Sequence, residues 1–336
     1  MEKELLIIGS GPAGLRAGQE AKRSGIDYLI LEQGEVAQSW REIRPDMSML
    51  SPCLPQRDWT SISAEFPIWK MDVNRPYCFA YQFVNYLRRF YEHYNLNLHP
   101  NTTVKSITKK NGVFEVVTDQ KIYFSKFVIV STGFFGNPYI PDIPGLIENP
   151  IVMHSHQFKS LKPHQNKRVV IIGSGNSAAE TALILAGHAQ VYLLSRGNLK
   201  FFSKTHNLCD IRGISESFLL ELINMEVIRY IPHVKIKKVE GNLIYLTNKT
   251  IEAQSIICAT GYHADLKSLG NSDLDVNKKT SFPIIKNSGE SNSVSNLFFA
   301  GPLAYVQISS LLIHGFIKMV PKTINEVSKR LVAETA

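Results

Sequence analysis

The sequence predicts an α/β protein with two similar three-layer lobes, each of the Rossmann-like kind that binds a nucleotide. Two observations predict this fold class. An apolar strand, a glycine turn and a helix follow one another in residues 5–34, and the same order returns in residues 169–197. Each copy is followed by alternating segments typical of a small β-meander, and then by a core strand that ends in Ser-Thr-Gly or Ala-Thr-Gly. A chain of 336 residues is long enough for two such lobes.

The composition is that of an ordinary globular protein. The formal net charge of +8 is spread thinly, without a run of like charges, so we expect small anionic ligands and no nucleic-acid partner. The four cysteines lack the spacing of a metal knuckle or a CxxC disulfide, which favours a reducing cytoplasm and no metal centre. We expect no signal peptide and, because no apolar run reaches about 18 residues, no membrane span.

The first copy has the order that dinucleotide binding requires. Apolar residues 5–8 enter a glycine turn, a helix is predicted over residues 15–24, and a second strand over residues 28–31 leads to Glu32. In such a turn the first glycine permits the bend, the second admits a pyrophosphate, and the third lets helix and strand pack closely. A carboxylate at Glu32 can accept hydrogen bonds from both hydroxyls of an adenosine ribose. The residues expected at this site are Gly9, Gly11, Pro12, Ala13, Gly14, Glu32 and Gln33.

The second copy differs at the ribose position. A strand over residues 169–172 enters the turn, a helix follows to about residue 186, and a strand over residues 191–195 leads to Arg196 in place of a carboxylate. A guanidinium matches a 2′-phosphate, so we expect NADPH to be preferred over NADH by roughly tenfold to a hundredfold. The alternative is that one copy is a degenerate duplicate that only packs. The residues expected at this site are Gly173, Ser174, Gly175, Asn176, Ser177, Ser195 and Arg196.

Nearly the whole chain resembles the flavoproteins with two dinucleotide-binding domains. The resemblance implies that residues 1–145 begin an FAD-binding lobe, that residues 146–264 form an inserted NADP-binding lobe, and that residues 265–336 complete the first lobe. The returning piece would hold a strand over residues 297–300 and a helix from about residue 307, whose N-terminus points at the flavin pyrimidine. Further cofactor residues implied in this way are Ser39, Trp40, Val104, Thr132, Gly133, Thr260, Gly261, Gly301, Gln307 and Ile308.

Four segments resemble the flavin-containing monooxygenase branch of these proteins. They are "LEQGEVAQSWRE", "GSGNSAAETALILAG", "CATGY" and "HSHQF". The chain departs from the branch fingerprint at Glu148 and Pro150, which occupy the places of a phenylalanine and a glycine. The branch implies an NADPH-dependent enzyme that oxygenates a small soft nucleophile with O2, through a flavin C4a-hydroperoxide.

Two other functions stay open. The chain also resembles bacillithiol-disulfide-reductase-like flavoproteins, which carry a cysteine in the first glycine turn where this sequence has Ala13. A flavin reductase acting on a thiol or disulfide, a quinone or a protein is therefore one alternative, and an FAD- and NADPH-binding redox sensor is another. The sequence leaves the acceptor substrate and a homodimer undecided.

Several single features have competing interpretations. Residues 47–59 pass either beside the flavin, where Ser51 and Gln56 would supply polar contacts, or over the surface as a Pro-rich loop. His154 is expected to orient a linker or touch NADP, and Cys53 to be a buried thiol. Residues 79–94 have the spacing of a core-facing amphipathic helix. A short strand is predicted over residues 282–285, a cap over residues 198–213, and a structural role for His314.

Overall fold

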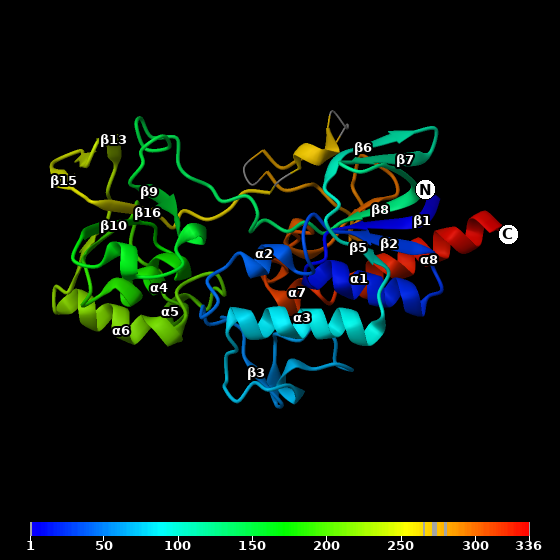
Figure 1. The fold of residues 1–336 in the computed structure, drawn as a ribbon, viewed down its shortest axis with the longest axis horizontal. Helices are drawn as coiled ribbons and strands as arrows, with labels where there is room; N and C mark the ends of the chain where they lie inside the picture. Colours follow the sequence, from blue (N-terminus) through cyan, green and yellow to red (C-terminus); the bar gives the residue numbers. More distant parts are fainter. Residues whose placement is uncertain (1, 265, 271–273, 279–280, 336) are drawn as a thin grey trace. The chain divides into compact units, whose positions relative to one another are not determined.

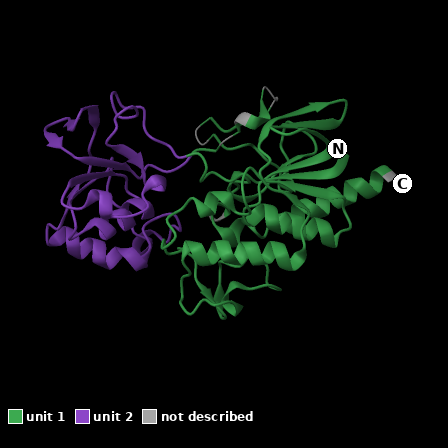
Figure 2. Cartoon of the chain, in the orientation of Figure 1, with its two compact units in different colours: residues 1–137, 263–336 green, residues 138–262 purple. Residues whose placement is uncertain are grey.

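The chain divides into two compact units, shown in different colours in Figure 2. The computed structural model describes residues 2–264, 266–270, 274–278 and 281–335. The first unit comprises residues 1–137 and 263–336, and the second comprises Pro138–Tyr262. The boundaries lie at 137 and 262, before those predicted at 145 and 264, because Pro138 pairs with Tyr262 and the Tyr139 N–H donates to Gly261 within the second unit.

The first unit is built on a seven-stranded sheet. Its strand order is β5-β2-β1-β8-β7-β6, and β17 pairs with β8. The parallel strands are β1 (Glu2–Ile8), β2 (Tyr28–Leu31), β5 (Leu98–His99), β8 (Ile122–Val130) and β17 (Leu297–Phe299). β6 (Val104–Lys110) and β7 (Val113–Thr118) pair antiparallel and run into β8, which confirms the predicted meander.

Strand β1 shows why this unit has three layers. Leu5 and Ile7 lie in a core with the helices α1 (Pro12–Arg23), α3 (Ala80–Tyr94) and α8 (Val320–Thr335). Leu6 and Ile8 point the other way, into a second core with side chains of the meander. Figure 1 shows the three helices on one side of the sheet and β6 and β7 on the other. The amphipathic helix predicted over residues 79–94 is confirmed, with its apolar face in the core.

The second unit repeats this plan around a five-stranded parallel sheet of order β12-β11-β10-β16-β9. The strands are β9 (Val152–His154), β10 (Arg168–Ile172), β11 (Gln190–Leu194), β12 (Ile228–Ile231) and β16 (Ser255–Cys258). The helices α4 (Asn176–Leu185) and α6 (Gly213–Asn224) contribute to the core on one face. The meander of β13 (Ile236–Glu240), β14 (Leu243–Leu246) and β15 (Thr250–Glu252) contributes to the core on the other as a separate sheet.

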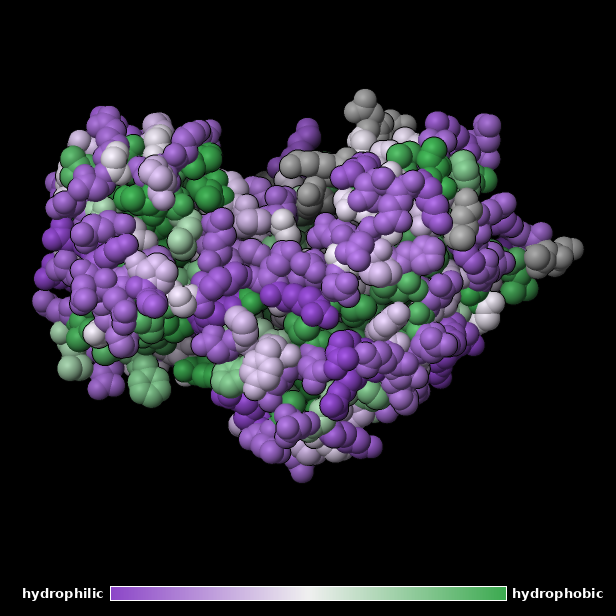
Figure 3. All heavy atoms as spheres, in the orientation of Figure 1, coloured by the Kyte–Doolittle hydropathy of each residue, from purple (hydrophilic) through white to green (hydrophobic). Residues whose placement is uncertain are grey.

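The remaining elements are short. They are α2 (Gln38–Arg41), α5 (Phe202–Thr205), α7 (Ile313–Phe316), the hairpin strands β3 (Cys53–Leu54) and β4 (Arg57–Asp58), and 3-10 turns at Ile68–Lys70, Ser155–Gln157, Lys162–His164, Lys267–Leu269, Gly301–Leu303 and Ile308–Leu311. In Figure 3 hydrophilic residues cover most of the visible face of each unit, with hydrophobic residues scattered among them. Among the described residues we find no helix of the length and apolarity that crossing a membrane requires.

Two predicted elements are wrong. Instead of one helix from about residue 307, the chain forms a 3-10 turn, the four-residue α7 and then α8. The Ser310 hydroxyl accepts hydrogen bonds from the N–H groups of Val306 and Gln307 at the start of the 3-10 turn, and Leu312 is extended, so no helix continues through it. Residues 282–285 form only isolated bridges through Pro283 and Ile285, because the chain there bends back on itself over few residues.

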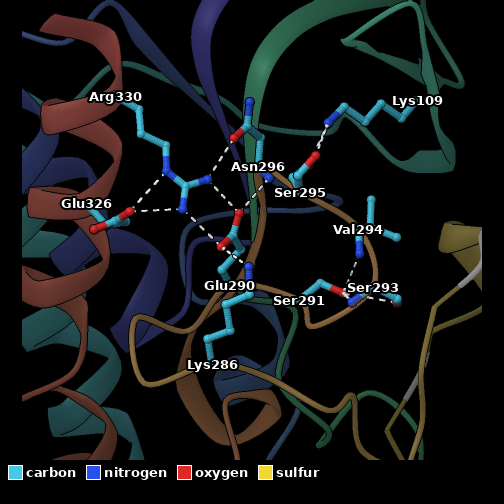
Figure 4. Close-up of polar contacts among 10 residues, drawn as sticks. All are labelled: Lys109, Lys286, Glu290, Ser291, Ser293, Val294, Ser295, Asn296, Glu326 and Arg330. Atoms are coloured by element: carbon cyan, nitrogen blue, oxygen red, sulfur yellow. Dashed lines mark hydrogen bonds and ion pairs between the residues drawn. The ribbon is translucent and has the colours of Figure 1, made fainter. Parts of the chain in front are cut away.

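An ion pair between the buried Glu290 carboxylate and half-buried Arg330 joins the returning segment to α8. The guanidinium of Arg330 donates two hydrogen bonds to the carboxylate of Glu290, with N–O distances of 2.5 and 3.0 Å. Figure 4 shows these contacts. Lys286 and the Asn296 N–H also donate to this carboxylate, at 2.8 and 2.9 Å. Burial alone would raise the pKa of the Glu290 carboxyl, but these hydrogen bonds together lower it to about 2. The charged pair therefore stabilises the native first unit at neutral pH.

We predict that Glu290→Gln lowers the free energy of unfolding at pH 7 by about 2–3 kcal/mol, because it removes the buried negative charge that Arg330 and Lys286 share. The folded pKa lies below the unfolded one, so the stabilisation is present above about pH 4.3 and is lost as the pH falls toward 2. Urea unfolding at pH 7 and pH 3 measures this. Glu334→Gln, which breaks the exposed pair with Lys126, serves as the control. A Glu290→Gln effect of equal size at both pH values contradicts the prediction.

Candidate dinucleotide-binding sites

The first glycine turn leaves room for a side chain at one of its three glycines only. A Cβ atom on Gly9 would lie 2.9 Å from the carbonyl oxygen of Ser131, and one on Gly14 would lie 1.9 Å from the carbonyl oxygen of Gly9. A Cβ atom on Gly11 would meet nothing within 4 Å. The outer two glycines are therefore required by close backbone packing, and the middle one faces the space that a pyrophosphate needs. This geometry fits a dinucleotide.

The helix that follows the turn is open at its N-terminus. Gly11 is the N-cap of α1, Pro12 occupies the first helical position, and no side chain caps the helix. Helix N–H groups without intrahelical partners attract phosphate, and the helix dipole adds to the attraction. In α4 of the second unit, Gly175 is likewise an N-cap without a capping side chain.

Glu32 is held in position at the end of β2. Its side chain is buried, and the N–H and hydroxyl of Ser10 donate to one carboxylate oxygen at 2.6 and 2.7 Å. The Gly34 N–H donates to the other oxygen at 3.3 Å. Ser10 was not predicted as a site residue, although its place inside the glycine turn was a signal for it. Gln33 is exposed beside this carboxylate.

The second turn has the same geometry with one substitution. A Cβ atom on Gly173 would lie 2.4 Å from the carbonyl oxygen of Ala259, whereas one on Gly175 would meet nothing within 4 Å. Ala178, in place of the third glycine, is fully buried. Ser174 is exposed in the turn, and Ser177 is exposed in the first turn of α4.

Asn176 uses its side chain within the protein. Its amide donates to the carbonyl oxygens of Cys209 and Asp210, at 3.3 and 3.0 Å, and accepts from the Arg212 N–H at 2.9 Å. The segment predicted as a cap is thus fastened to the start of α4. Only the backbone of Asn176 is left for a phosphate.

Arg196 follows β11 and is exposed. Within the part of the chain that the structure describes, it makes no hydrogen bond or ion pair, whereas Ser195 bonds to the Gly197 carbonyl and the Tyr230 hydroxyl. The guanidinium is therefore available to an anionic ligand, and the Ser195 hydroxyl is engaged in fixing the loop that carries it.

The Thr-Gly pairs that close the core strands are also fixed. Gly133 and Gly261 have φ angles of 70° and 86°, where glycine is favoured. Buried His154 bonds through Nε2 to the Gly261 carbonyl at 3.0 Å, and its Nδ1 accepts from the His156 N–H at 3.1 Å. Burial lowers the pKa of His154 to about 4, so the ring is neutral. Thr260 donates to the Tyr139 carbonyl, and Thr132 is exposed after β8.

The returning segment contacts the first turn. A Cβ atom on Gly301, whose φ is 74°, would lie 3.2 Å from the Cβ of Ala13, so these two predicted residues lie side by side.

The other residues predicted to contact the cofactor lie in different surroundings. Gln307 is exposed, and the side chain of Ile308 lies outside the described residues. Val104 packs against the second core, and Trp40 packs edge-on against Phe83 and Phe135. Ser39 neighbours Gly136.

The two residues predicted beside the flavin lie at or next to the β3–β4 hairpin. Gln56 is exposed at the tip of the β3–β4 hairpin, which Figure 1 shows beyond α3, on the side away from the sheet. Ser51 is buried next to this hairpin, and its carbonyl accepts from Thr60. The Trp59 ring lies 4.9 Å from that of His314, so this segment does contact α7.

The prediction that Cys53 is a buried thiol is confirmed, but its interaction with a second thiol was not predicted. Cys53 and Cys78 are both buried, and Cys53 donates to the carbonyls of Arg75 and Pro76 at 3.4 and 3.3 Å. A hydrogen bond from Cys78 lowers the pKa of Cys53, and the same interaction raises the pKa of Cys78 far above its usual range. Cys209 is exposed, but burial of its sulfur raises its pKa. No cluster of His, Cys, Asp or Glu suited to a metal occurs among the described residues.

Two Rossmann-type units, each with an open glycine turn, define a flavoprotein oxidoreductase that uses FAD and NAD(P)H. The chain belongs to the pyridine nucleotide-disulphide oxidoreductase family, whose model matches residues 6–301. It is 26% identical over 309 residues to the bacilliredoxin reductase Bdr of Bacillus subtilis, covering 90% of each chain.

Two solved structures are similar over nearly the full length. The bacillithiol disulfide reductase Bdr of Staphylococcus aureus is 27% identical, with a TM-score of 0.86 and coverage of 100% of both chains. A flavin-containing monooxygenase of Stenotrophomonas maltophilia is 20% identical, with a TM-score of 0.84 and coverage of 98% of this chain and 99% of that one. The second likeness concerns the fold alone.

We predict that Glu32→Ala weakens FAD binding roughly tenfold to a hundredfold, because hydrogen bonds from a ribose to a carboxylate are worth roughly 1.5–3 kcal/mol. Titration of the apoprotein with FAD, followed by flavin fluorescence, measures the dissociation constant. Ser10→Ala, which removes one of the groups that orient Glu32, should have a smaller effect in the same direction.

The control for this experiment is Glu35→Ala, which removes an exposed carboxylate three residues further along. Equal FAD affinity in Glu32→Ala and Glu35→Ala would show that the ribose is not bound by Glu32.

Proposed function

We propose that the protein is an NADPH-dependent FAD enzyme of the flavin-containing monooxygenase type, which oxygenates a small soft nucleophile with O2. One observation carries the nucleotide part of this proposal. The two turns share one backbone geometry but end in opposite charges, a buried carboxylate at Glu32 and an exposed guanidinium at Arg196. The carboxylate suits a free ribose diol, and the guanidinium suits a 2′-phosphate.

In this proposal the first unit holds FAD and the second holds NADPH. Gly11 and the N-terminus of α1 would receive the FAD pyrophosphate, and Glu32 would bind its ribose. Gly175 and the start of α4 would receive the NADPH pyrophosphate, and Arg196 its 2′-phosphate. The chemistry that bound FAD supplies is acceptance of a hydride and reaction of the reduced ring with O2.

The thiols favour oxygenation over disulfide reduction. Ala13 stands where the bacillithiol-disulfide-reductase-like proteins carry a cysteine, and its buried Cβ packs beside Gly301. Cys53 and Cys78 are buried together, and exposed Cys209 has a raised pKa. Cys258 is also buried, which raises its pKa. A nucleophilic thiol needs a lowered pKa together with access, and none of the four cysteines, all of which lie within the described residues, combines the two.

A flavin reductase with a quinone or protein acceptor is the second candidate. The similarity to the reductase Bdr extends over 90% of both chains, so it involves far more of the sequence than the position of the missing thiol. This similarity favours a reductase. In such an enzyme the two nucleotides bind as above, and the electrons leave without oxygen insertion. The two candidates share every residue assigned to cofactor binding and differ in the fate of O2.

We predict that Arg196→Ala raises the Michaelis constant for NADPH roughly tenfold to a hundredfold and changes that for NADH little, because only NADPH has the 2′-phosphate. Steady-state oxidation of both cofactors by the FAD-loaded enzyme measures the ratio. Lys237→Ala, which removes an exposed cation on β13, is the matched control. Equal loss with both cofactors would refute the phosphate assignment.

We predict that the FAD-loaded enzyme converts thioanisole to its sulfoxide with NADPH and O2, and that the sulfoxide carries ¹⁸O when ¹⁸O2 is supplied. Mass spectrometry of the product and measurement of released hydrogen peroxide check this. If peroxide instead equals the NADPH consumed and no sulfoxide forms, while a benzoquinone is reduced, the reductase is correct. Binding of NADPH without turnover with O2 or any quinone would support the redox sensor.

A further inference from the structure

The first unit contains a cavity that neither glycine turn uses. Its volume is about 400 Å³, within the range of small-molecule sites. One wall is the segment 71–75, and the other is the exposed side of α3 over its first turns. Tyr81, Asn85 and Arg89 are spaced four residues apart, so they lie along one face of that helix.

Arg75 is the most distinctive group in this cavity. Its guanidinium carbon lies 3.5 Å from the centre of the Phe79 ring, so the cation is stacked on the aromatic face. Its Nε is buried and has no hydrogen-bond partner among the described residues. A buried N–H without an acceptor is costly, and a ligand oxygen would satisfy it.

Arg89 adds a second guanidinium to the lining. Its side chain is exposed and makes no hydrogen bond or ion pair within the described ranges. Neighbouring Arg88 is different, because it bonds to Glu92 and Asn85. Asp72 is the only carboxylate among the lining residues, so two guanidiniums against one carboxylate leave the cavity with a net charge of +1. That balance favours a monoanion.

The other lining residues are apolar, amide or, at Tyr81, phenolic. Met71, Val73 and Phe79 supply apolar surface, and the Phe79 and Tyr81 rings lie 5.8 Å apart at 29°. The side chain of Gln82 is engaged, since it accepts from the Phe79 N–H and donates to the Asp72 carbonyl, and this holds the two walls together. The cavity thus combines a fixed frame, a flat apolar surface and two cations.

We propose that this cavity binds a small organic monoanion, a carboxylate attached to a flat apolar body. The carboxylate would bind Arg75 and Arg89, and the apolar body would lie against the Phe79 and Tyr81 side of the cavity. A planar guanidinium pairs with a carboxylate through parallel hydrogen bonds, which a neutral amide cannot match. The site does not depend on the reaction proposed above, because none of its residues belongs to either glycine turn.

Benzoate is the probe for this site, and benzamide is its neutral counterpart. The FAD-loaded protein should bind benzoate saturably in isothermal titration calorimetry, and benzamide at least about tenfold more weakly. Arg89→Gln should weaken benzoate binding about tenfold without affecting the fold, because the side chain is exposed. Arg23→Gln makes the same change of charge at an exposed position outside the cavity and should leave the affinity unchanged.

Three results would overturn the proposal. They are absence of saturable benzoate binding, equal affinity in Arg89→Gln and Arg23→Gln, and loss of benzoate binding when the enzyme is saturated with NADPH. The last result would assign the anion to a dinucleotide turn. FAD content and NADPH oxidation are measured on the same samples, so failure of the cavity is distinguished from failure of the proposed function.

Discussion

The close approach of backbone to backbone at the two glycine turns is the constraint on which the rest of the structure depends. At Gly14 even a methyl group would overlap the carbonyl of Gly9, and at Gly173 it would overlap the carbonyl of Ala259. These contacts set how tightly each helix packs on its strand, and so where the open N-terminus of the helix lies. The open position at Gly11 or Gly175 can admit a phosphate because the close contacts of the neighbouring residues fix the backbone around it.

The strand–turn–helix motif occurs twice in the chain, and the two copies differ mainly in the charge that follows their second strand. Glu32 is buried, and Ser10 from the turn itself orients it, so turn and carboxylate form one unit. Arg196 is exposed and makes no side-chain hydrogen bond to the described residues, while Ser195 and Tyr230 fix the loop that carries it. A buried carboxylate is costly unless fixed donors bond to it, whereas water solvates an exposed guanidinium when no anion is bound. The two sites therefore differ in rigidity as well as in charge.

The sequence predicted those features that depend on local patterns. The strands around Gly9 and Gly173, the two meanders and the helix at residues 79–94 follow from apolar period and glycine spacing. The resemblance to known flavoproteins also implied that residues 297–300 return to the first sheet, but other features that depend on distant partners were not predicted. The hydrogen bond between the free thiols of Cys53 and Cys78 joins residues from separate segments. The side-chain hydrogen bonds of Asn176 reach a loop more than thirty residues away. The break between the 3-10 turn and α7 lies at Leu312, whose backbone is extended, and apolar periodicity does not register such a break.

The first unit is completed only by the end of the chain, and this affects how it can form. β17 pairs with β8 and Gly301 lies against Ala13, so contacts of the first sheet join residues separated by the whole second unit. Such non-local contacts cost loop-closure entropy before they stabilise anything. The ion pair of buried Glu290 with Arg330 offsets part of that cost, because it joins the segment before β17 to the last helix. The ion pair thus fixes the segment before β17 and the last helix to one another in the folded first unit.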